Sequence, residues 1–356
     1  MLVMLSRPVA SFVAAVACCL VLSSAPLAAQ QLLPQPQDSP AASVEQTIGI
    51  TEVSVDYHRP AVKGRAIWGV LVPFGEVWRA GANENTTITF STPVKVEGKD
   101  LAAGTYGLHM LPTASTWTAI FSRNASSWGS FSYSEKEDAL RVTVTPVEAP
   151  ATEWLAYEFG DFSADAATLS LRWEKLSVPI HLAVQTDQLV VDYARNAYLR
   201  GQAGFSWQGP NSAAAYCLRH KLNLDEALTW SDRSLGMTQN YTNLSVKAGL
   251  LEALGHTAEA APLRQQAVAV ATEPELNTLG YQYLQSKQME KALELFKANV
   301  AAHPESWNTH DSLAEACQMS GDTKTAIEHY RKALELVKDD TNKARIAGTL
   351  EQLGAM

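Results

Sequence analysis

Residues 169–201, LSLRWEKLSVPIHLAVQTDQLVVDYARNAYLRG, contain the change of pattern that decides the fold. In the first part, the apolar side chains Leu169, Leu171 and Trp173 alternate with polar ones. A period of two is typical of an antiparallel strand with one face in water. In the second part the period becomes about 3.6, which predicts a helix over residues 187–201. The chain therefore passes from a β domain into a helical region near residue 186.

The two-residue alternation extends back to Val44. It recurs in residues 86–90 and 140–144, and turn-forming groups such as Glu97–Asp100 and Pro112–Ser115 separate the runs. About ten short strands with close turns are typical of a β-sandwich or a barrel. We therefore predict an antiparallel β-sandwich or barrel over residues 43–185.

An internal repeat organises the helical part. Small and aromatic residues recur at a spacing of 34, which is the tetratricopeptide period. The matching pairs are Leu279 and Leu313, Gly280 and Ala314, Ala292 and Ala326, and Phe296 and Tyr330. We predict a bridging helix over residues 186–206 and an all-α, tetratricopeptide-like solenoid over residues 207–356, so the fold class is α+β with segregated domains. A generic bundle of helical hairpins is the alternative.

The N-terminus has the order of a secretory signal. Arg7 precedes an apolar run over residues 9–22, and small residues follow up to Ala29. This order predicts a signal peptide over residues 1–29 and a Gln- and Pro-rich flexible leader over residues 30–42. An uncleaved anchor is the alternative. We expect a periplasmic or secreted protein with no stable membrane span after cleavage.

Composition excludes several functions. The net charge of −9 argues against a nucleic-acid partner, which normally requires a basic face. Beyond the predicted signal peptide only Cys217 and Cys317 remain, so no disulfide framework or Cys-X-X-Cys motif exists. No His-Glu-X-X-His spacing and no phosphate-cradling glycine motif is present. We therefore expect no metal and no cofactor.

The densest cluster of unusual residues lies in residues 57–90, YHRPAVKGRAIWGVLVPFGEVWRAGANENTTITF. A connection this long inside a β domain is usually functional or disordered, and its tryptophans favour order. Arginines there suit a small anionic ligand, and tryptophan faces suit a sugar-like one. The candidate ligand-binding residues are Arg59, Arg65, Trp68, Trp78, Arg79, Asn83, Glu84 and, on a later strand, His109. The alternative is a structural role, in which hydrogen bonds of the same polar groups hold the loop in place and the tryptophans form its small hydrophobic core.

Four stretches resemble one bacterial family. They are VDYHRPAVKGRAIWG at 55–69, VPFGEVWRAGANENTTITFS at 72–91, AGTYGLHMLP at 103–112 and WTAIFSRNASSWGSFSYSEKEDALRV at 117–142. Residues 41–184 thus resemble the domain of unknown function 2911 family. The resemblance implies an exported protein, since members are typically exported and some carry C-terminal tetratricopeptide repeats. It implies no activity.

Three functions remain open at this point. The first is an envelope binding protein that holds a ligand in the β domain and a protein partner on its helical repeats. The second is a hydrolase-type enzyme with its site in the 57–90 loop, using Glu84 or His109 as acid or base. The third is a structural assembly factor. The lack of a Gly-X-Ser-X-Gly motif favours a binding protein over an enzyme.

Overall fold

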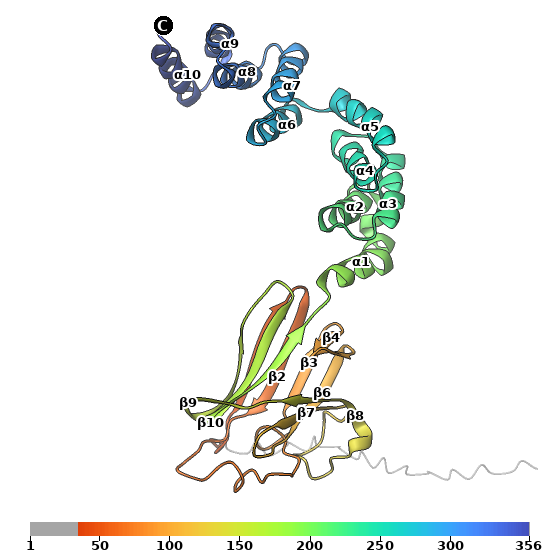
Figure 1. Cartoon of the computed structure of the whole chain (residues 1–356), viewed down its shortest axis with the longest axis vertical. Coiled ribbons are helices and arrows are strands. Elements are labelled where there is room, and N and C mark those ends of the chain that lie inside the picture. Colours follow the sequence, from red (N-terminus) through yellow and green to blue (C-terminus); the bar gives the residue numbers. More distant parts are fainter. Residues whose placement is uncertain (1–34, 356) are drawn as a thin grey trace, which may run out of the picture.

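The computed structural model describes residues 35–355, a β domain followed by an arc of helices (Figure 1). The predicted signal peptide, residues 1–29, lies outside the described residues, as does most of the predicted leader at residues 30–42. The first strand begins at Ala41, slightly before the predicted start of the β domain at residue 43.

Two antiparallel sheets form the β domain. The six-stranded sheet has the order β1 (Ala41–Ile48), β2 (Thr51–His58), β3 (Thr87–Phe90), β6 (Gly104–Leu111), β7 (Trp117–Ser122) and β8 (Asp138–Val144). The four-stranded sheet has the order β5 (Lys99–Leu101), β4 (Val94–Val96), β10 (Ala166–Ala183) and β9 (Val147–Gly160). The two sheets share one buried core, so the domain is a sandwich in the described residues rather than a closed barrel.

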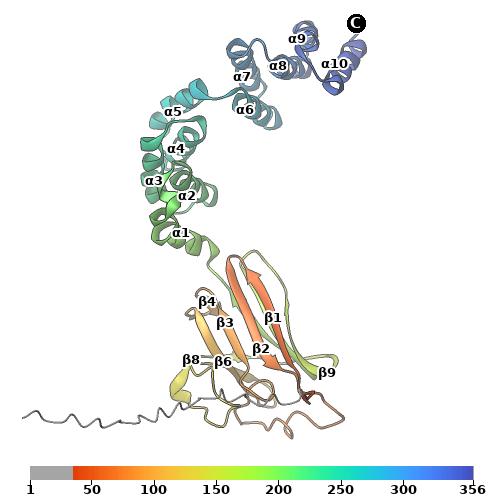
Figure 2. The same cartoon turned by 180° about the vertical axis from the view of Figure 1, so that it is seen from behind.

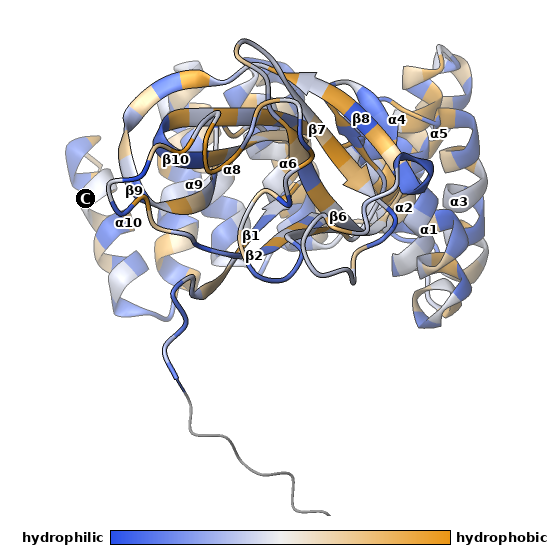
Figure 3. Cartoon of the chain, turned by 90° about the horizontal axis from the view of Figure 1, so that it is seen from below, coloured by the Kyte–Doolittle hydropathy of each residue, from blue (hydrophilic) through white to orange (hydrophobic). Residues whose placement is uncertain are grey.

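The predicted alternation places the core. On β10, Leu169, Leu171 and Trp173 are no more than 1% exposed, while Ser170 and Arg172 remain partly exposed. Figure 3, which looks up at the β domain, shows apolar residues alternating along the strands that face one another. Burial of this face is the main stabilising contribution to the domain, because apolar area removed from water contributes about 25 cal/mol per Å².

The bridging segment differs from its prediction. Helix α1 covers Thr186–Asn196, and two short 3-10 turns, η2 (Tyr198–Arg200) and η3 (Gln202–Phe205), follow it. The helix predicted over residues 187–201 is therefore present up to Asn196, and its extension to Gly201 is wrong. The α-helix ends because Ala197 leaves the helical region with φ −130°. The chain then folds back where Gly204 lies against Leu199, whose carbonyl oxygen would be 2.1 Å from a Cβ at position 204.

Nine further helices follow within the described residues, mostly as antiparallel pairs. They are α2 (Gln208–His220), α3 (Leu224–Met237), α4 (Tyr241–Ala253), α5 (Thr257–Val270), α6 (Glu273–Gln285), α7 (Met289–Ala302), α8 (Trp307–Ser320), α9 (Thr323–Leu336) and α10 (Asp340–Gln352). In both side views they curve away from the β domain, and the C-terminus lies at the far end (Figures 1 and 2).

The 34-residue repeat corresponds to two helix pairs, α6 with α7 and α8 with α9. Ala292 and Ala326 are fully buried where the helices of each pair cross. A Cβ at Gly280 would lie 2.5 Å from the ring of Phe296, so this position must lack a side chain for α6 to approach α7. Close approach through small residues is the physical cause of the repeat, and the predicted solenoid is confirmed.

Candidate functional site

The 57–90 connection is ordered by the sheet beside it. Residues 59–86 join β2 to β3, and part of this segment pairs with β6 beyond the end of β3. The main chains of Trp78 and Met110 exchange two hydrogen bonds of 2.8 Å, and Gly75 donates to Pro112. The loop therefore extends the six-stranded sheet.

The two loop tryptophans complete an aromatic cluster. Trp68 lies edge-on to Trp117, with 4.9 Å between ring centroids, and Trp78 stacks on Trp173 at 5.9 Å. One face of Trp78 is thus covered, and both rings pack against the buried core. This arrangement favours the structural alternative for Trp68 and Trp78 over a role as sugar-stacking platforms.

Four of the candidate polar residues tie the loop down. Arg59 donates from Nε to the carbonyl of Leu155 at 2.8 Å, and Arg65 donates to the carbonyl of Val62 at 3.1 Å. Asn83 donates to the carbonyl of Ser39 at 3.1 Å. Glu84 lies 3.2 Å from Nε2 of His58. The first three contacts satisfy main-chain carbonyls, as long loops require, and the fourth joins two side chains of the connection and the preceding strand.

The other two candidates, Arg79 and His109, lie near one another. The pairing of β6 with β3 and with β7 is regular, so His109 and Tyr106 point to opposite faces of the sheet. On the face to which His109 points, the segment 122–137 contributes Ser130. His109 is 3% exposed, and its Nδ1 lies 2.9 Å from Oγ of Ser130. Burial lowers the pKa of His109 to about 4; the charge of Asp138 opposes this shift and that of Arg79 adds to it. His109 is therefore neutral near pH 7.

Arg79 is a half-buried cation. Its Nη1 donates to the carbonyl of Asn83, and its guanidinium lies 5.7 Å from the ring centre of Phe131. Burial lowers the pKa of Arg79. Within residues 35–355 no carboxylate lies within 4.0 Å of the guanidinium. The site accordingly carries one uncompensated positive charge.

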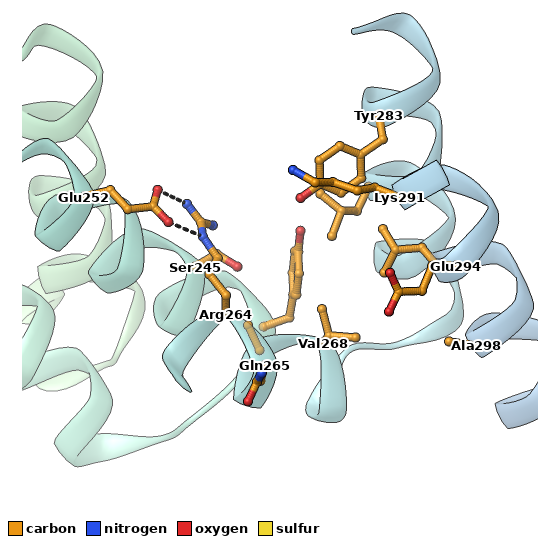
Figure 4. Close-up of a pocket in the computed structure, with 13 residues that line it drawn as sticks. Ser245, Glu252, Arg264, Gln265, Val268, Tyr283, Lys291, Glu294 and Ala298 are labelled. Carbon is orange, nitrogen blue, oxygen red and sulfur yellow. Dashed lines mark hydrogen bonds and ion pairs between the residues drawn. The ribbon is translucent and has the colours of Figure 1, made fainter. Parts of the chain in front are cut away.

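A second candidate site lies in the helical region, where the prediction named no residues. A cavity of about 490 Å³ opens between the pair α4–α5 and the pair α6–α7 (Figure 4). We call it the α4–α7 cleft. Its lining residues are Tyr241, Ser245, Glu252, Arg264, Gln265, Ala267, Val268, Leu279, Tyr283, Lys291, Glu294, Leu295 and Ala298.

An interruption of the helix stack produces this cleft. In the described part of the chain, the buried clusters of α1–α5 end with Ala248, Leu251 and Ala260, whereas the next cluster begins at Leu284 and continues to Ala355. No buried cluster has members from both sides of the α5–α6 junction. A solenoid normally buries a continuous core between neighbouring repeats, so an unfilled gap remains here.

The walls of the cleft combine apolar and charged groups. Glu252 and Arg264 form a bidentate pair at 2.8 and 3.1 Å. This pairing lowers the pKa of Glu252 and raises that of Arg264. On the opposite wall, Nζ of Lys291 lies 5.4 Å from the ring centre of Tyr283. Figure 4 shows these two walls facing each other across open space.

Sequence reasoning missed Ser130 and the whole α4–α7 cleft. Ser130 belongs to a Gly-Ser-Phe stretch with no catalytic or binding signature, and only tertiary contact brings it to His109. The cleft had one sequence signal, the weakening of the 34-residue pattern before Leu279. That signal indicates imperfect stacking without naming the residues left facing the gap.

Two kinds of feature are absent from residues 35–355. Within this range no group of three or more histidine, cysteine, aspartate or glutamate side chains has an arrangement suited to a metal ion. None of the helices in this range has the length and apolar character needed to cross a bilayer.

The fold and its sites define a two-part protein, a β-sandwich joined to a tetratricopeptide-type solenoid. Residues 39–182 match the family described as Protein of unknown function (DUF2911), and residues 309–344 match a tetratricopeptide repeat. The predicted resemblance is thereby confirmed. No curated protein matches the chain.

Solved structures similar to this chain include two of MamA. The one described as MamA 41-end from Desulfovibrio magneticus RS-1 is 21% identical, with a TM-score of 0.27, covering 43% of this chain and 86% of that chain. Another, titled Crystal structure of MamA, is 15% identical, with a TM-score of 0.29, covering 45% and 92%. The APC/C hetero-tetramer Cut9–Hcn1 is 18% identical, with a TM-score of 0.26, covering 47% and 33%.

Proposed function

We propose that the chain is a binding protein of the cell envelope whose helical repeats receive a segment of a protein partner in the α4–α7 cleft. The observation that carries this proposal is the interrupted helix stack, which leaves a cleft of about 490 Å³ lined from four helices. Tetratricopeptide repeats supply the capacity for protein interaction.

The lining supports a peptide as the occupant. Val268 and Leu279 are half-buried apolar side chains that a partner's apolar anchor would cover. Tyr241 and Tyr283 offer hydroxyl groups for main-chain hydrogen bonds. Lys291 and Glu294 have no ion-pair partner within the described residues and remain available to charged groups at the rim.

A peptide-display selection against the full chain tests the cleft. We expect selected peptides to lose about tenfold or more in affinity for Val268→Glu, because that change places a charge on the apolar wall. Met319→Glu is the matched control, since Met319 is 58% exposed on α8 and outside the cleft. Peptides that bind both variants as well as the parent chain would contradict this proposal.

We also propose export, on the strength of the signal-like order of residues 1–29. The expected outcome is a mature chain that begins at Gln30 in cells, detected by mass spectrometry of the N-terminal peptide. Replacing the apolar Val13 by Arg interrupts the run and should leave the precursor uncleaved. A cellular protein that retains Met1 or its immediate neighbours, found in the cytosol, contradicts export.

For the β domain we propose a small anionic ligand rather than a sugar-like one, because Trp78 has a face covered by Trp173 and Arg79 carries an uncompensated charge. The hydrolase alternative has one supporting observation, the contact of Ser130 with His109. A base with a pKa of about 4 accepts a proton poorly near pH 7, and Glu84 is occupied by His58. Binding is therefore the better supported of the two.

A further inference from the structure

Arg79 has unused hydrogen-bonding capacity. Nη1 donates to the carbonyl of Asn83, while Nη2 and Nε, which form one edge of the guanidinium fork, have no partner within residues 35–355. Partly buried charges are normally paired, since removing them from water is costly. This edge of Arg79 is the kind of group that an external anion satisfies.

The segment 129–131 lies against this guanidinium and brings a serine hydroxyl to the site. Gly129 has φ +66°, and a Cβ there would lie 2.7 Å from Nη1 of Arg79. The positive φ favours glycine here, and the absence of a side chain lets the 129–131 segment lie against Arg79, which brings Ser130 to the same region. When His109 carries its proton on Nδ1, it donates to Oγ of Ser130, and the serine hydroxyl is free to donate to a ligand.

A buried acceptor without a partner lies behind this layer. Asn85 is 7% exposed, and its Nδ2 donates to the carbonyl of Asn124 at 3.2 Å, whereas Oδ1 has no hydrogen-bond partner within the described chain. Gly107 lies next to this amide: a Cβ there would be 3.1 Å from Nδ2 of Asn85 and 3.2 Å from Nε2 of His109. The site thus has an inner polar layer as well as the exposed cation.

The backbone of the loop is held in an unfavourable conformation at this point. Ala80 and Asn83, which flank the turn after Arg79, have φ of +53° and +56°. The carbonyl of Ala80 accepts hydrogen bonds from Tyr157 at 2.9 Å and Thr86 at 3.3 Å, which stabilise the turn. Non-glycine residues with positive φ cluster at ligand-binding sites, where surrounding contacts enforce them.

We propose that Arg79, with Ser130, binds the carboxylate of a small organic acid that has an apolar body. This proposal rests on the anionic ligand proposed above for the β domain and names its chemistry. The planar fork of arginine matches the two oxygens of a carboxylate. Phe131, which is 84% exposed and lies against Arg79, supplies an apolar surface for the rest of the ligand.

The charge balance favours a monoanion over a dianion. Among the described residues, Arg79 is the cation at the site without an ion-pair partner, and His109 stays neutral near pH 7. Asp138, whose charge acts on His109, is itself paired with Arg141 at 2.9 Å, so Arg79 balances one negative charge on the ligand and leaves a second one unbalanced. Phosphate-type dianions should therefore bind more weakly than carboxylates.

Calorimetric titration of the full chain with phenylacetate, acetate and inorganic phosphate tests this inference. We expect saturable binding of phenylacetate, weaker binding of acetate, and the weakest binding of phosphate. Arg79→Gln should reduce phenylacetate affinity by about 10- to 100-fold, because one charged hydrogen-bonding partner is lost. Arg79→Lys keeps the charge without the fork and should give an intermediate loss. Ser130→Ala should also weaken binding.

Arg172→Gln is the matched control, because Arg172 is an arginine of the same domain that lies on β10, outside the loop, and pairs with Glu158 at 3.0 Å. It should keep the parent affinity. Tryptophan fluorescence melting identifies variants that fail to fold, and in that case Arg79→Lys and Ser130→Ala decide the outcome. Three results would overturn the inference. The first is that Arg79→Lys and Ser130→Ala both bind phenylacetate as tightly as the parent chain. The second is that phosphate binds more tightly than phenylacetate, and the third is that millimolar phenylacetate shows no saturable binding. None of these results bears on peptide binding in the α4–α7 cleft, which is tested with different variants in the other domain.

Discussion

His109 is an imidazole that burial keeps neutral inside a β-sheet protein. Its pKa is lowered to about 4 in the folded chain, against 6.5 when unperturbed. Between these two pH values the imidazole is protonated in the unfolded chain and neutral in the folded chain. Unfolding therefore takes up a proton, and a falling pH favours the unfolded state. The contribution to stability is complete above about pH 6.5 and is lost progressively down to about pH 4, amounting to roughly 3 kcal/mol.

We therefore expect His109→Gln to weaken the acid sensitivity of the β domain. Urea unfolding followed by tryptophan fluorescence at pH 7 and pH 4.5 measures this, because six of the nine tryptophans lie in the β domain. His303→Gln is the control, since that side chain lies in the helical region and has no ion-pair partner within the described residues. If His109→Gln loses as much stability on acidification as the parent, burial of the imidazole is not the cause.

Single helices of the solenoid depend on close contact at defined positions. Gly280 on α6 faces the ring of Phe296 on α7, and a methyl group would not fit without movement of that ring. Gly348 on α10 has no neighbouring atom within 4 Å of an added Cβ. The same glycine-to-alanine change should therefore have opposite effects at the two positions.

Gly280→Ala should destabilise the helical region by about 1–3 kcal/mol through overpacking. Gly348→Ala should stabilise it by about 0.5–1 kcal/mol, because alanine favours a helix interior. Circular dichroism during thermal unfolding measures both. A Gly280→Ala chain that melts at or above the parent temperature would show that Phe296 moves aside without cost.

Hydrogen exchange on the same variant reports how far the repeats cooperate. Because no buried cluster in the described chain crosses the α5–α6 junction, the loss of protection caused by Gly280→Ala should be confined to α6–α10. Loss of protection that spreads equally into α2–α5 would mean that the cleft does not separate the stack.

At the scale of the whole molecule, the β domain and the helical region have separate cores. The buried cluster of the sandwich ends at Val184, and the first helical cluster begins at Val191. For this reason the part of the tryptophan fluorescence transition that comes from the six tryptophans of the β domain should remain that of the parent in Gly280→Ala, while the circular dichroism transition shifts. The separation also allows a ligand in one domain and a partner on the other to be studied independently.

The sequence by itself determined the two-part architecture. Alternation of period two up to residue 185 and the 34-residue spacing of Ala292 and Ala326 are both local patterns, and local patterns report secondary structure and repeat packing directly. The polar cluster around Arg79 was also recognisable as a group of candidates. The sequence could not separate the structural members of this cluster from the ligand-binding ones. Whether an arginine donates to a main-chain carbonyl or keeps free donors for a ligand depends on residues far away in the sequence.

Tertiary structure alone decided the sites. Ser130 meets His109 only because the segment after β7 lies over β6, and Arg59 is satisfied by Leu155, nearly one hundred residues away. The α4–α7 cleft exists because two helix pairs fail to bury a common core, which is a property of their packing geometry. Spacing along the chain records which residues share a helix face, and it does not record which faces remain uncovered when the helices assemble.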